Sequence, residues 1–398
     1  MRYVVYIYVS LLLLLTGCNN RLPENAAALF GTWFIHPTFQ NRTAVEELAL
    51  SAEGVDSLVQ VIRSRTLLSG PATVQLRDEN HTRYTVGYDT PDSFSFDSTY
   101  PLIIYLHGGV GTLKNTKGEK AYLMFSDLQD SMPLFLASPS ANRQAPWWSE
   151  AGLNRILQTL RFMSLHFPVD PQKVFLAGVS DGATGCYAAA NTIAAPFAGF
   201  FSISGFGGML PRLGMELYPA NLMQRPIYDI HAGKDRLYPI EMVNGFLDQL
   251  ERNGVAIKRK VYPEEQHGFD YRSEEYDTLT ALIRRWSKPQ RASVKWHFLP
   301  GYPARPDNLL SWRVQQNGKA SCSAFWRNDS LHISTDNLKS VGVISPISER
   351  RKITVKTEDF SMSISPAHES NQLLMDKMQH FCFPNINRKN CYRIELNI

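Results

Sequence analysis

A chain of 398 residues with 44% hydrophobic and 20% charged side chains is too long for one ordinary domain and too apolar for a disordered protein. Its formal net charge of +4 is small for this length, and its basic residues gather only in short clusters such as residues 350–352. Because phosphate-driven binding needs a concentrated basic face, this charge argues against a nucleic-acid partner. We expect more than one globular unit.

The first residues have the features of an export signal. Arg2 precedes an apolar run over residues 3–15, which has the length of a signal-peptide core and is short for a membrane span. Residues 15–18, Leu-Thr-Gly-Cys, resemble the lipobox of bacterial lipoproteins, in which the matching cysteine, here Cys18, becomes lipidated after cleavage. The alternative is an unlipidated secretory signal. We predict a signal peptide over residues 1–18 and a lipid-anchored protein of the bacterial cell envelope, with the membrane as a partner.

The other cysteines fit an exported protein without metal. Cys382 and Cys391 are close enough in sequence to form a bridge in an oxidising compartment, although their spacing alone leaves this open. Cys186 and Cys322 are expected to be small buried residues. No CxxC or HExxH motif occurs, so we predict no metal site and no cofactor.

Three further regions follow the signal. Residues 19–83 are predicted to form a tether, up to about Gln40, and a helical appendage, since apolar residues recur at helical spacing between 43 and 65. Residues 84–288 alternate short apolar runs with helical segments, which is typical of an α/β fold with a mostly parallel, doubly wound sheet. Residues 292–398 alternate β-like runs with turns and predict a β-rich, sandwich-like C-terminal domain.

The elements expected in these regions are short. In the central region we expect strands at 102–106, 134–137, 174–177, 200–203, 227–230 and 257–262, and helices at 153–165, 183–193, 241–252 and 274–286. In the last region we expect strands at 294–298, 324–326, 330–335, 341–344 and 353–355.

The clearest motif is G-x-S-x-G at residues 178–182. It lies between the expected strand ending at Ala177 and the helix starting near Ala183, where two glycines permit a tight, strained turn that presents the serine. We therefore predict Ser180 as a catalytic nucleophile.

A serine hydroxyl needs a base, and histidine has a suitable pKa. In a hydrolase sheet of this kind the order along the chain is serine, acid, histidine. His267 comes directly after the last expected strand, with Gly268 beside it, whereas His231 lies inside a strand with no strand left before it to supply the acid. The remaining later histidines lie in the β-rich tail: His297, His332, His368 and His380. We predict His267 as the base.

The acid should follow a strand between these two residues. Asp235 comes just after the strand at 227–231 and is the predicted partner of the His267 Nδ1–H. The alternatives are that Asp235 only caps the next helix, or that the acid is Asp229 or Asp270.

Acyl transfer also needs donors for the developing oxyanion. Residues 107–111, His-Gly-Gly-Val-Gly, follow the strand at 102–106, and the backbone N–H of Gly109 is the predicted first donor, with Gly108 as the next choice. The second predicted donor is the N–H of Asp181. His107 is expected to shape this loop by hydrogen bonding. Trp148 is a candidate substrate contact that packing would explain equally well.

Taken together, residues 105–109, 170–174 and 178–182 with Asp235 and His267 resemble the α/β-hydrolase superfamily. More narrowly, residues 84–288 look like the bacterial phospholipase/carboxylesterase and polyhydroxybutyrate-depolymerase or feruloyl-esterase-like branch. The resemblance implies a serine hydrolase that cleaves carboxylic (acyl) esters, of small molecules or linked to polysaccharide. The β-rich tail is similar, more loosely, to a tail domain of some exported members. Asp181 and Ala183 depart from the usual pattern, which bears on substrate preference.

Two other functions stay open. A serine peptidase of the prolyl-oligopeptidase type uses the same motif and residue order, but the segment between Cys18 and Tyr84 is too short for the propeller such enzymes usually carry. A non-catalytic surface lipoprotein, whose β-rich tail binds polysaccharide or a partner, belongs to a different class.

Overall fold

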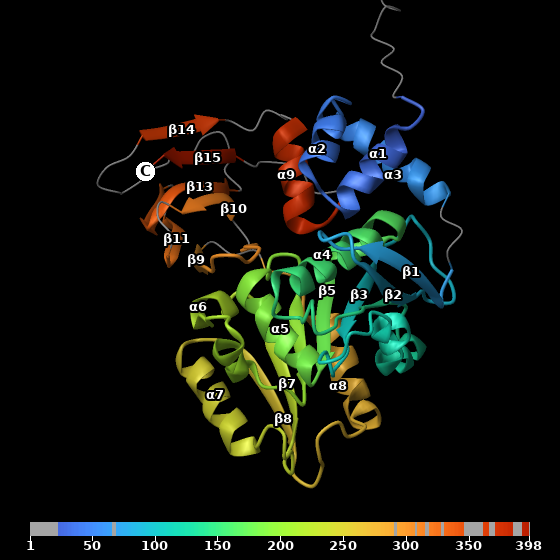
Figure 1. Ribbon diagram of the computed structural model, residues 1–398, viewed down its shortest axis with the longest axis vertical. Helices are drawn as coiled ribbons and strands as arrows, with labels where there is room; N and C mark the ends of the chain where they lie inside the picture. The colour runs from blue at the N-terminus through green and yellow to red at the C-terminus, as the bar shows by residue number, and fades with distance from the viewer. Residues whose placement is uncertain are drawn as a thin grey trace, which may run out of the picture.

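The computed structural model describes residues 23–65, 69–289, 293–306, 309–314, 318–327, 330–345, 361–365, 371–384 and 392–397 (Figure 1). Residues 1–22 lie outside these ranges, so the signal peptide and the lipid anchor at Cys18 stay predictions. Among the helices within the described ranges, none combines the length and the apolar character that a membrane span requires.

The centre of the protein is an eight-stranded sheet with the strand order β1-β2-β4-β3-β5-β6-β7-β8. Its strands are β1 (Ala72–Arg77), β2 (Arg83–Asp89), β3 (Tyr100–Leu106), β4 (Phe135–Pro139), β5 (Val169–Val179), β6 (Gly199–Ile203), β7 (Ile227–Ala232) and β8 (Ile257–Tyr262). The strands β3 to β8 all run parallel to one another. At one edge, β2 pairs antiparallel with β4, and β1 pairs antiparallel with β2. The predicted mostly parallel sheet is confirmed.

The sheet begins earlier than the predicted boundary at residue 84. The strand β1 alternates half-buried and exposed residues, so it contains no apolar run that would mark it in the sequence. It pairs in register with β2, from Ala72 opposite Tyr88 to Arg77 opposite Arg83.

Helices cover both faces of the sheet, and each face has its own core. The helical segments are α4 (Glu150–His166), α5 (Asp181–Thr192), α6 (Pro219–Leu222), α7 (Ile240–Arg252) and α8 (Arg272–Arg285), with 3-10 segments η1 (Lys117–Glu119), η2 (Ala121–Asp130) and η3 (Gly207–Leu213). Side chains of α4, α5 and α7 pack with Leu102 and Ile104 of β3, whereas those of η2 and α8 pack with Ile103 and Tyr105. This alternation along one strand is what a buried, doubly wound sheet requires.

A small helical unit lies beside α4 (Figure 1). It consists of α1 (Ala26–Ile35), α2 (Phe39–Glu46), α3 (Ala52–Ser64) and α9 (Asn371–Phe381). The expected tether up to Gln40 needs correction, because Phe30 and Phe34 of α1 are fully buried in a core shared with Met378 of α9. Arg63 fixes the unit to the end of α4 by donating to the carbonyls of Ser164, Leu165 and Phe167.

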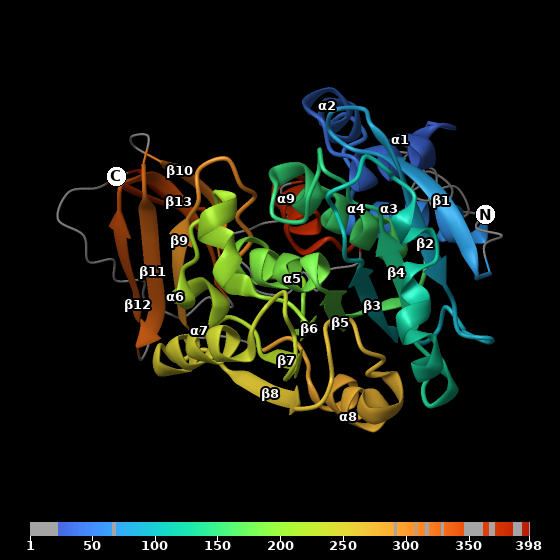
Figure 2. The same cartoon turned by 60° about the horizontal axis from the view of Figure 1, so that its bottom comes forward.

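The C-terminal part contains two antiparallel sheets, which Figure 2 shows to one side of the central sheet. The first has the order β10-β13-β15-β14 and the second β12-β11-β9. Their strands are β9 (Ser293–Phe298), β10 (Leu309–Val314), β11 (Ala320–Arg327), β12 (Ser330–Asp336), β13 (Leu338–Ser345), β14 (Ser361–Ser365) and β15 (Tyr392–Asn397). The predicted β-rich character is confirmed, but α9 was not expected there. The strand expected at 353–355 lies outside the described residues.

Three cysteines lie among the described residues, and their burial can be compared with the prediction. Cys186 and Cys322 are buried, as predicted. Cys382 is buried as well, at the end of α9. Cys391 lies outside the described residues, so the bridge between these two stays a prediction.

His380 of α9 is expected to make the protein sensitive to acid. Its Nε2 lies 2.7 Å from the carbonyl of Pro306, and burial lowers the pKa of its ring to about 3. The unfolded chain, with a histidine pKa of about 6.5, therefore binds a proton that the folded chain does not bind between pH 6.5 and 3. The free energy of unfolding should fall as the pH drops through this range, by up to about 1.4 kcal/mol per pH unit from this residue.

Urea unfolding at several pH values checks this. His380→Gln, which keeps an N–H for Pro306, should show a shallower fall in stability than the wild type. The matched control is His81→Asn, since the His81 ring is exposed in the folded protein. An unchanged slope in His380→Gln would contradict the expectation.

Candidate active site

Ser180 lies in a strained turn between β5 and α5. Its φ of 55° and ψ of −118° are rare for a residue with a side chain, and it is the N-cap residue of α5. A Cβ on Gly178 would lie 2.3 Å from the carbonyl oxygen of Gly182, and a Cβ on Gly182 would lie 1.9 Å from that of Leu106. Both glycines of the motif are therefore needed for the close approach that lifts Ser180 above the sheet edge.

The structure brings the three predicted residues together. The Nε2 of His267 lies 3.0 Å from the Oγ of Ser180, and its Nδ1 lies 2.7 Å from the Oδ2 of Asp235. Because a carboxylate only accepts hydrogen bonds, Nδ1 carries the proton and Nε2 is free to accept the serine hydroxyl. The Asp235 carboxylate is fully buried, whereas the His267 side chain is 27% exposed. The serine end of the triad is therefore accessible to solvent, whereas the acid end is buried.

The alternatives for the acid occupy other environments. Asp270 forms a surface ion pair with Arg272, 2.7 Å away. Asp229 lies in the core and accepts hydrogen bonds from the hydroxyls of Tyr187 and Ser202. Asp235 does not cap α7 either, since the N-cap of that helix is Pro239.

Two backbone N–H groups point to an anion site beside Ser180. Gly109 has a φ of +66°, and a Cβ on Gly108 would lie only 3.1 Å from the Cβ of Ser180. Asp181 is the first residue of α5, where helical N–H groups have no partner within the helix. Within the described part of the chain, neither the N–H of Gly109 nor that of Asp181 donates a hydrogen bond to a protein acceptor. They are therefore free to bind a negatively charged oxygen.

The side chain of Asp181 holds the glycine loop in place. Its Oδ2 accepts a hydrogen bond of 2.9 Å from the N–H of Val110. From the other side, the ammonium of Lys117 donates to the carbonyl of Gly109. Asp181 thus links the turn that carries Ser180 to the loop that carries Gly109.

Asp181→Ala is expected to lower kcat for ester hydrolysis on the order of 10–100-fold, because the loop would lose its fixed position while its N–H groups remain. Asp181→Asn is the matched variant, since its side-chain oxygen can still accept from Val110. Steady-state kinetics on a p-nitrophenyl ester checks both. Equal losses in the two variants, or none in Asp181→Ala, would contradict the role of this hydrogen bond.

His107 shapes the same loop, as expected. Its Nε2 accepts from the N–H of Ala141 at 3.0 Å, so Nδ1 carries the proton and donates to the carbonyl of Gly108 at 2.9 Å. Burial lowers the pKa of His107 to about 4, which keeps the ring neutral as these two bonds require. The indole of Trp147 donates to the carbonyl of His107 at 2.9 Å. Trp148 is half-buried at the edge of the core, and its predicted substrate contact stays a prediction.

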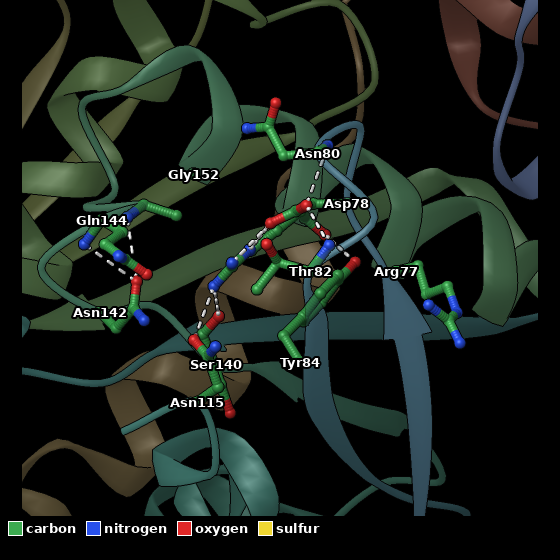
Figure 3. Close-up of polar contacts among 12 residues, drawn as sticks. Arg77, Asp78, Asn80, Thr82, Tyr84, Asn115, Ser140, Asn142, Gln144 and Gly152 are labelled. Atoms are coloured by element: carbon green, nitrogen blue, oxygen red, sulfur yellow. Dashed lines mark hydrogen bonds and ion pairs between the residues drawn. The ribbon is translucent and has the colours of Figure 1, made fainter. Parts of the chain in front are cut away.

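A buried ion pair lies within a group of polar contacts that includes Asp78, Asn115 and Ser140 (Figure 3). Arg155 of α4 binds Asp78, in the turn between β1 and β2, with a contact of 2.6 Å. Arg155 also donates to the carbonyl of Ser140 and to the side chain of Asn115. Arg155 thereby links the loops after β3 and β4, and removing Asp78 would leave its buried charge unpaired.

Two residues near the triad were missed from the sequence. Tyr238 lies three residues after Asp235, and its ring stands edge-on to that of His267 with 5.8 Å between centroids. Phe206 extends this aromatic wall, 6.1 Å from Tyr238. Both come from loops whose course cannot be deduced from strand and helix patterns. Among the described residues, no cluster of histidine, cysteine or carboxylate side chains fits a metal ion.

Comparison with known proteins gives one family match. The dienelactone hydrolase family matches residues 141–291, which is less than half of the chain. No curated protein matches the sequence significantly.

Solved structures with similar folds include esterases and a peptidase. A thermostable esterase is 19% identical, with a TM-score of 0.44, over 54% of this chain and 63% of its own. An acylaminoacyl peptidase from Pyrococcus horikoshii is 16% identical, with a TM-score of 0.45, over 58% of this chain and 44% of its own. A ferulic acid esterase is 16% identical, with a TM-score of 0.44, over 54% of this chain and 97% of its own. The chain thus spans less than two thirds of the first two. From the family match and the strand order, we conclude that the chain contains an α/β-hydrolase fold, followed by a β-rich C-terminal part.

Proposed function

We propose that this protein is a serine hydrolase that cleaves carboxylic esters through an acyl-enzyme on Ser180. The observation that carries the proposal is the line of hydrogen bonds from Asp235 through His267 to Ser180, next to the free N–H groups of Gly109 and Asp181. The parts of this site follow β3, β5, β7 and β8, at the carboxyl edge of the parallel strands, where such sheets bind ligands.

In the first step, the Oγ of Ser180 attacks the ester carbonyl and its proton passes to the Nε2 of His267. The carbonyl oxygen becomes an oxyanion, which the N–H groups of Gly109 and Asp181 bind. When the intermediate collapses, the bond to the leaving alcohol breaks and His267 returns the proton to that oxygen. Asp235 keeps the proton of His267 on Nδ1 and stabilises the imidazolium.

In the second step, a water molecule takes the place of the alcohol. His267 removes a proton from the water, which attacks the acyl carbon, and the same N–H groups bind the second oxyanion. Collapse releases the carboxylic acid and returns the proton to Ser180. The partly exposed His267 ring is compatible with access of water from solvent.

The proposed substrates are small-molecule or polysaccharide-linked esters. The aromatic rings of Tyr238 and Phe206 pack near His267 and are largely buried, which makes this side of the site apolar. The dienelactone hydrolase match over residues 141–291 supports hydrolysis but does not select the ester.

A substrate panel on the protein lacking residues 1–18 tests the proposal. We expect turnover of short-chain p-nitrophenyl esters and of at least one of acetylated sugars, feruloyl esters and phospholipids. Cleavage of dipeptidyl substrates without any ester hydrolysis would instead support a peptidase. Failure of a fluorophosphonate probe to label the protein would support a non-catalytic binding protein.

We also propose that the enzyme is anchored by a lipid on Cys18 in the bacterial cell envelope. The support is the signal and lipobox pattern of residues 1–18. Incorporation of an alkyne-tagged fatty acid into the wild type but not into Cys18→Ser tests this, and equal labelling of both would refute it.

A further inference from the structure

A second histidine, His231, lies next to the acid of the proposed triad. His231, near the end of β7, is 1% exposed and was set aside at the sequence level because it lies inside a strand. Its Nε2 is 2.9 Å from the carbonyl of Tyr238 and 3.5 Å from the Oδ2 of Asp235. Since a carbonyl only accepts, the proton of His231 is on Nε2.

The hydrogen bond from His231 to Tyr238 joins β7 to the turn that holds the acid. The N–H groups of Leu237 and Tyr238 donate to the Oδ1 of Asp235 at 2.8 and 2.9 Å. The carbonyl of Tyr238 is in turn held by His231. The Tyr238 ring, fixed by the same backbone, stands edge-on to His267. The orientation of both the acid and the base therefore depends on the bond that His231 makes.

The contact with Oδ2 adds an electrostatic effect. At 3.5 Å it is too long for a good hydrogen bond, but it places the polar N–H group of His231 near the oxygen that His267 also uses. Both groups are buried, so water screens this interaction little. The N–H dipole of His231 thereby offsets part of the negative charge on Asp235.

The other groups around His231 are also buried. Asp229, two residues earlier on the same face of β7, acts electrostatically on His231, and burial raises the pKa of this carboxyl. Its surroundings contain Ser202, Tyr187 of α5 and, more distantly, Arg259 of β8. The Oδ1 of Asp229 and the Nδ1 of His231 have no hydrogen-bond partner among the described residues. Among the described residues, Asp235 is the one carboxylate within ion-pair distance of the His231 Nε2.

We propose that His231 is a positioning residue for the triad: its Nε2–H fixes the turn from Asp235 to Tyr238 and offsets part of the charge on Asp235. It touches neither the substrate nor Ser180, and it acts only through Asp235 and Tyr238. This inference rests on the proposed function, since it concerns the same triad.

Two substitutions separate this role from simple core packing. His231→Leu removes the N–H, whereas His231→Gln keeps an N–H at the position of Nε2. With an ester substrate, we expect His231→Leu to lower kcat on the order of 10–100-fold with KM little changed, because the acid and the base lose their alignment. We expect His231→Gln to recover most of this loss.

The pH profile and an NMR signal provide the readouts that a packing role would not move. Without the N–H, Asp235 presents more negative charge to His267, which favours the imidazolium. The acid limb of the kcat/KM profile should therefore move to higher pH in His231→Leu and stay near the wild-type position in His231→Gln. The low-field proton resonance of the His267 Nδ1–H should shift in the Leu variant even without substrate.

The control is Ile230→Val, which removes one methyl group from the opposite face of β7. It should lower the melting temperature slightly and leave the pH profile and the proton resonance unchanged. Equal pH profiles in His231→Leu and the wild type, or equal losses in the Leu and Gln variants, would overturn the inference. If the wild type hydrolyses no ester, the proposed function fails instead, and the resonance still reports on His231.

Discussion

Ser180→Ala is expected to lower kcat for ester hydrolysis roughly 10⁴-fold or more while leaving the fold intact. In the proposed mechanism the Ser180 hydroxyl forms the acyl-enzyme, so its loss removes the covalent route. The residual rate should come from the N–H groups of Gly109 and Asp181 and from substrate binding. Steady-state kinetics and thermal unfolding of the same preparations measure the two effects.

Ser180→Ala removes a single oxygen atom, so a loss of activity can be assigned to the hydroxyl rather than to a change of fold. Ser180 is partly exposed and its backbone N–H bonds to the carbonyl of Ile203, a bond that alanine keeps. Ser273→Ala, at an exposed position of α8, is the matched control and should retain full activity. Wild-type turnover by Ser180→Ala would mean that another residue carries the reaction.

Asp235→Asn is expected to lower kcat by about 10⁴-fold. An amide in place of the carboxylate would offer a donor as well as an acceptor to His267, which favours the wrong tautomer and removes the charge that stabilises the imidazolium. The shape of the site should not change, because the Asn oxygen can still accept from the N–H groups of Leu237 and Tyr238.

Asp270→Asn is the control for this variant. Asp270 lies three residues after His267, but its carboxylate is paired with Arg272 at the surface. Exposed ion pairs contribute little, so this substitution should leave both kcat and stability close to the wild type. If Asp270→Asn lost activity and Asp235→Asn did not, the assignment of the acid would be reversed.

The sequence predicted the catalytic centre better than its surroundings. Ser180 and Asp235 could be located because each follows a buried strand, and His267 because it follows the partly exposed strand β8; the carboxyl ends of parallel strands meet at one sheet edge. The fold class followed from the same alternation of strands and helices. Their distances and hydrogen bonds required the structure.

The parts that were missed depend on tertiary contacts. The strand β1 is half-exposed, so its pairing with β2 was not visible as an apolar run. The helices α1 and α9 are far apart in the sequence and form one core only because both pack together beside α4. The role of His231 could not be deduced from its position in a strand. Its hydrogen bond to the Tyr238 carbonyl depends on the path of the turn after β7.

Trapping of the acyl-enzyme tests the central claim most directly. The wild-type protein is mixed with a p-nitrophenyl ester, quenched in acid within the first turnovers, and digested for peptide mass spectrometry. The account predicts a mass increase of one acyl group on the peptide that contains Ser180, accompanied by a burst of p-nitrophenol. Steady ester hydrolysis with the acyl group on a different residue, or with no burst and no acylated peptide, would contradict it.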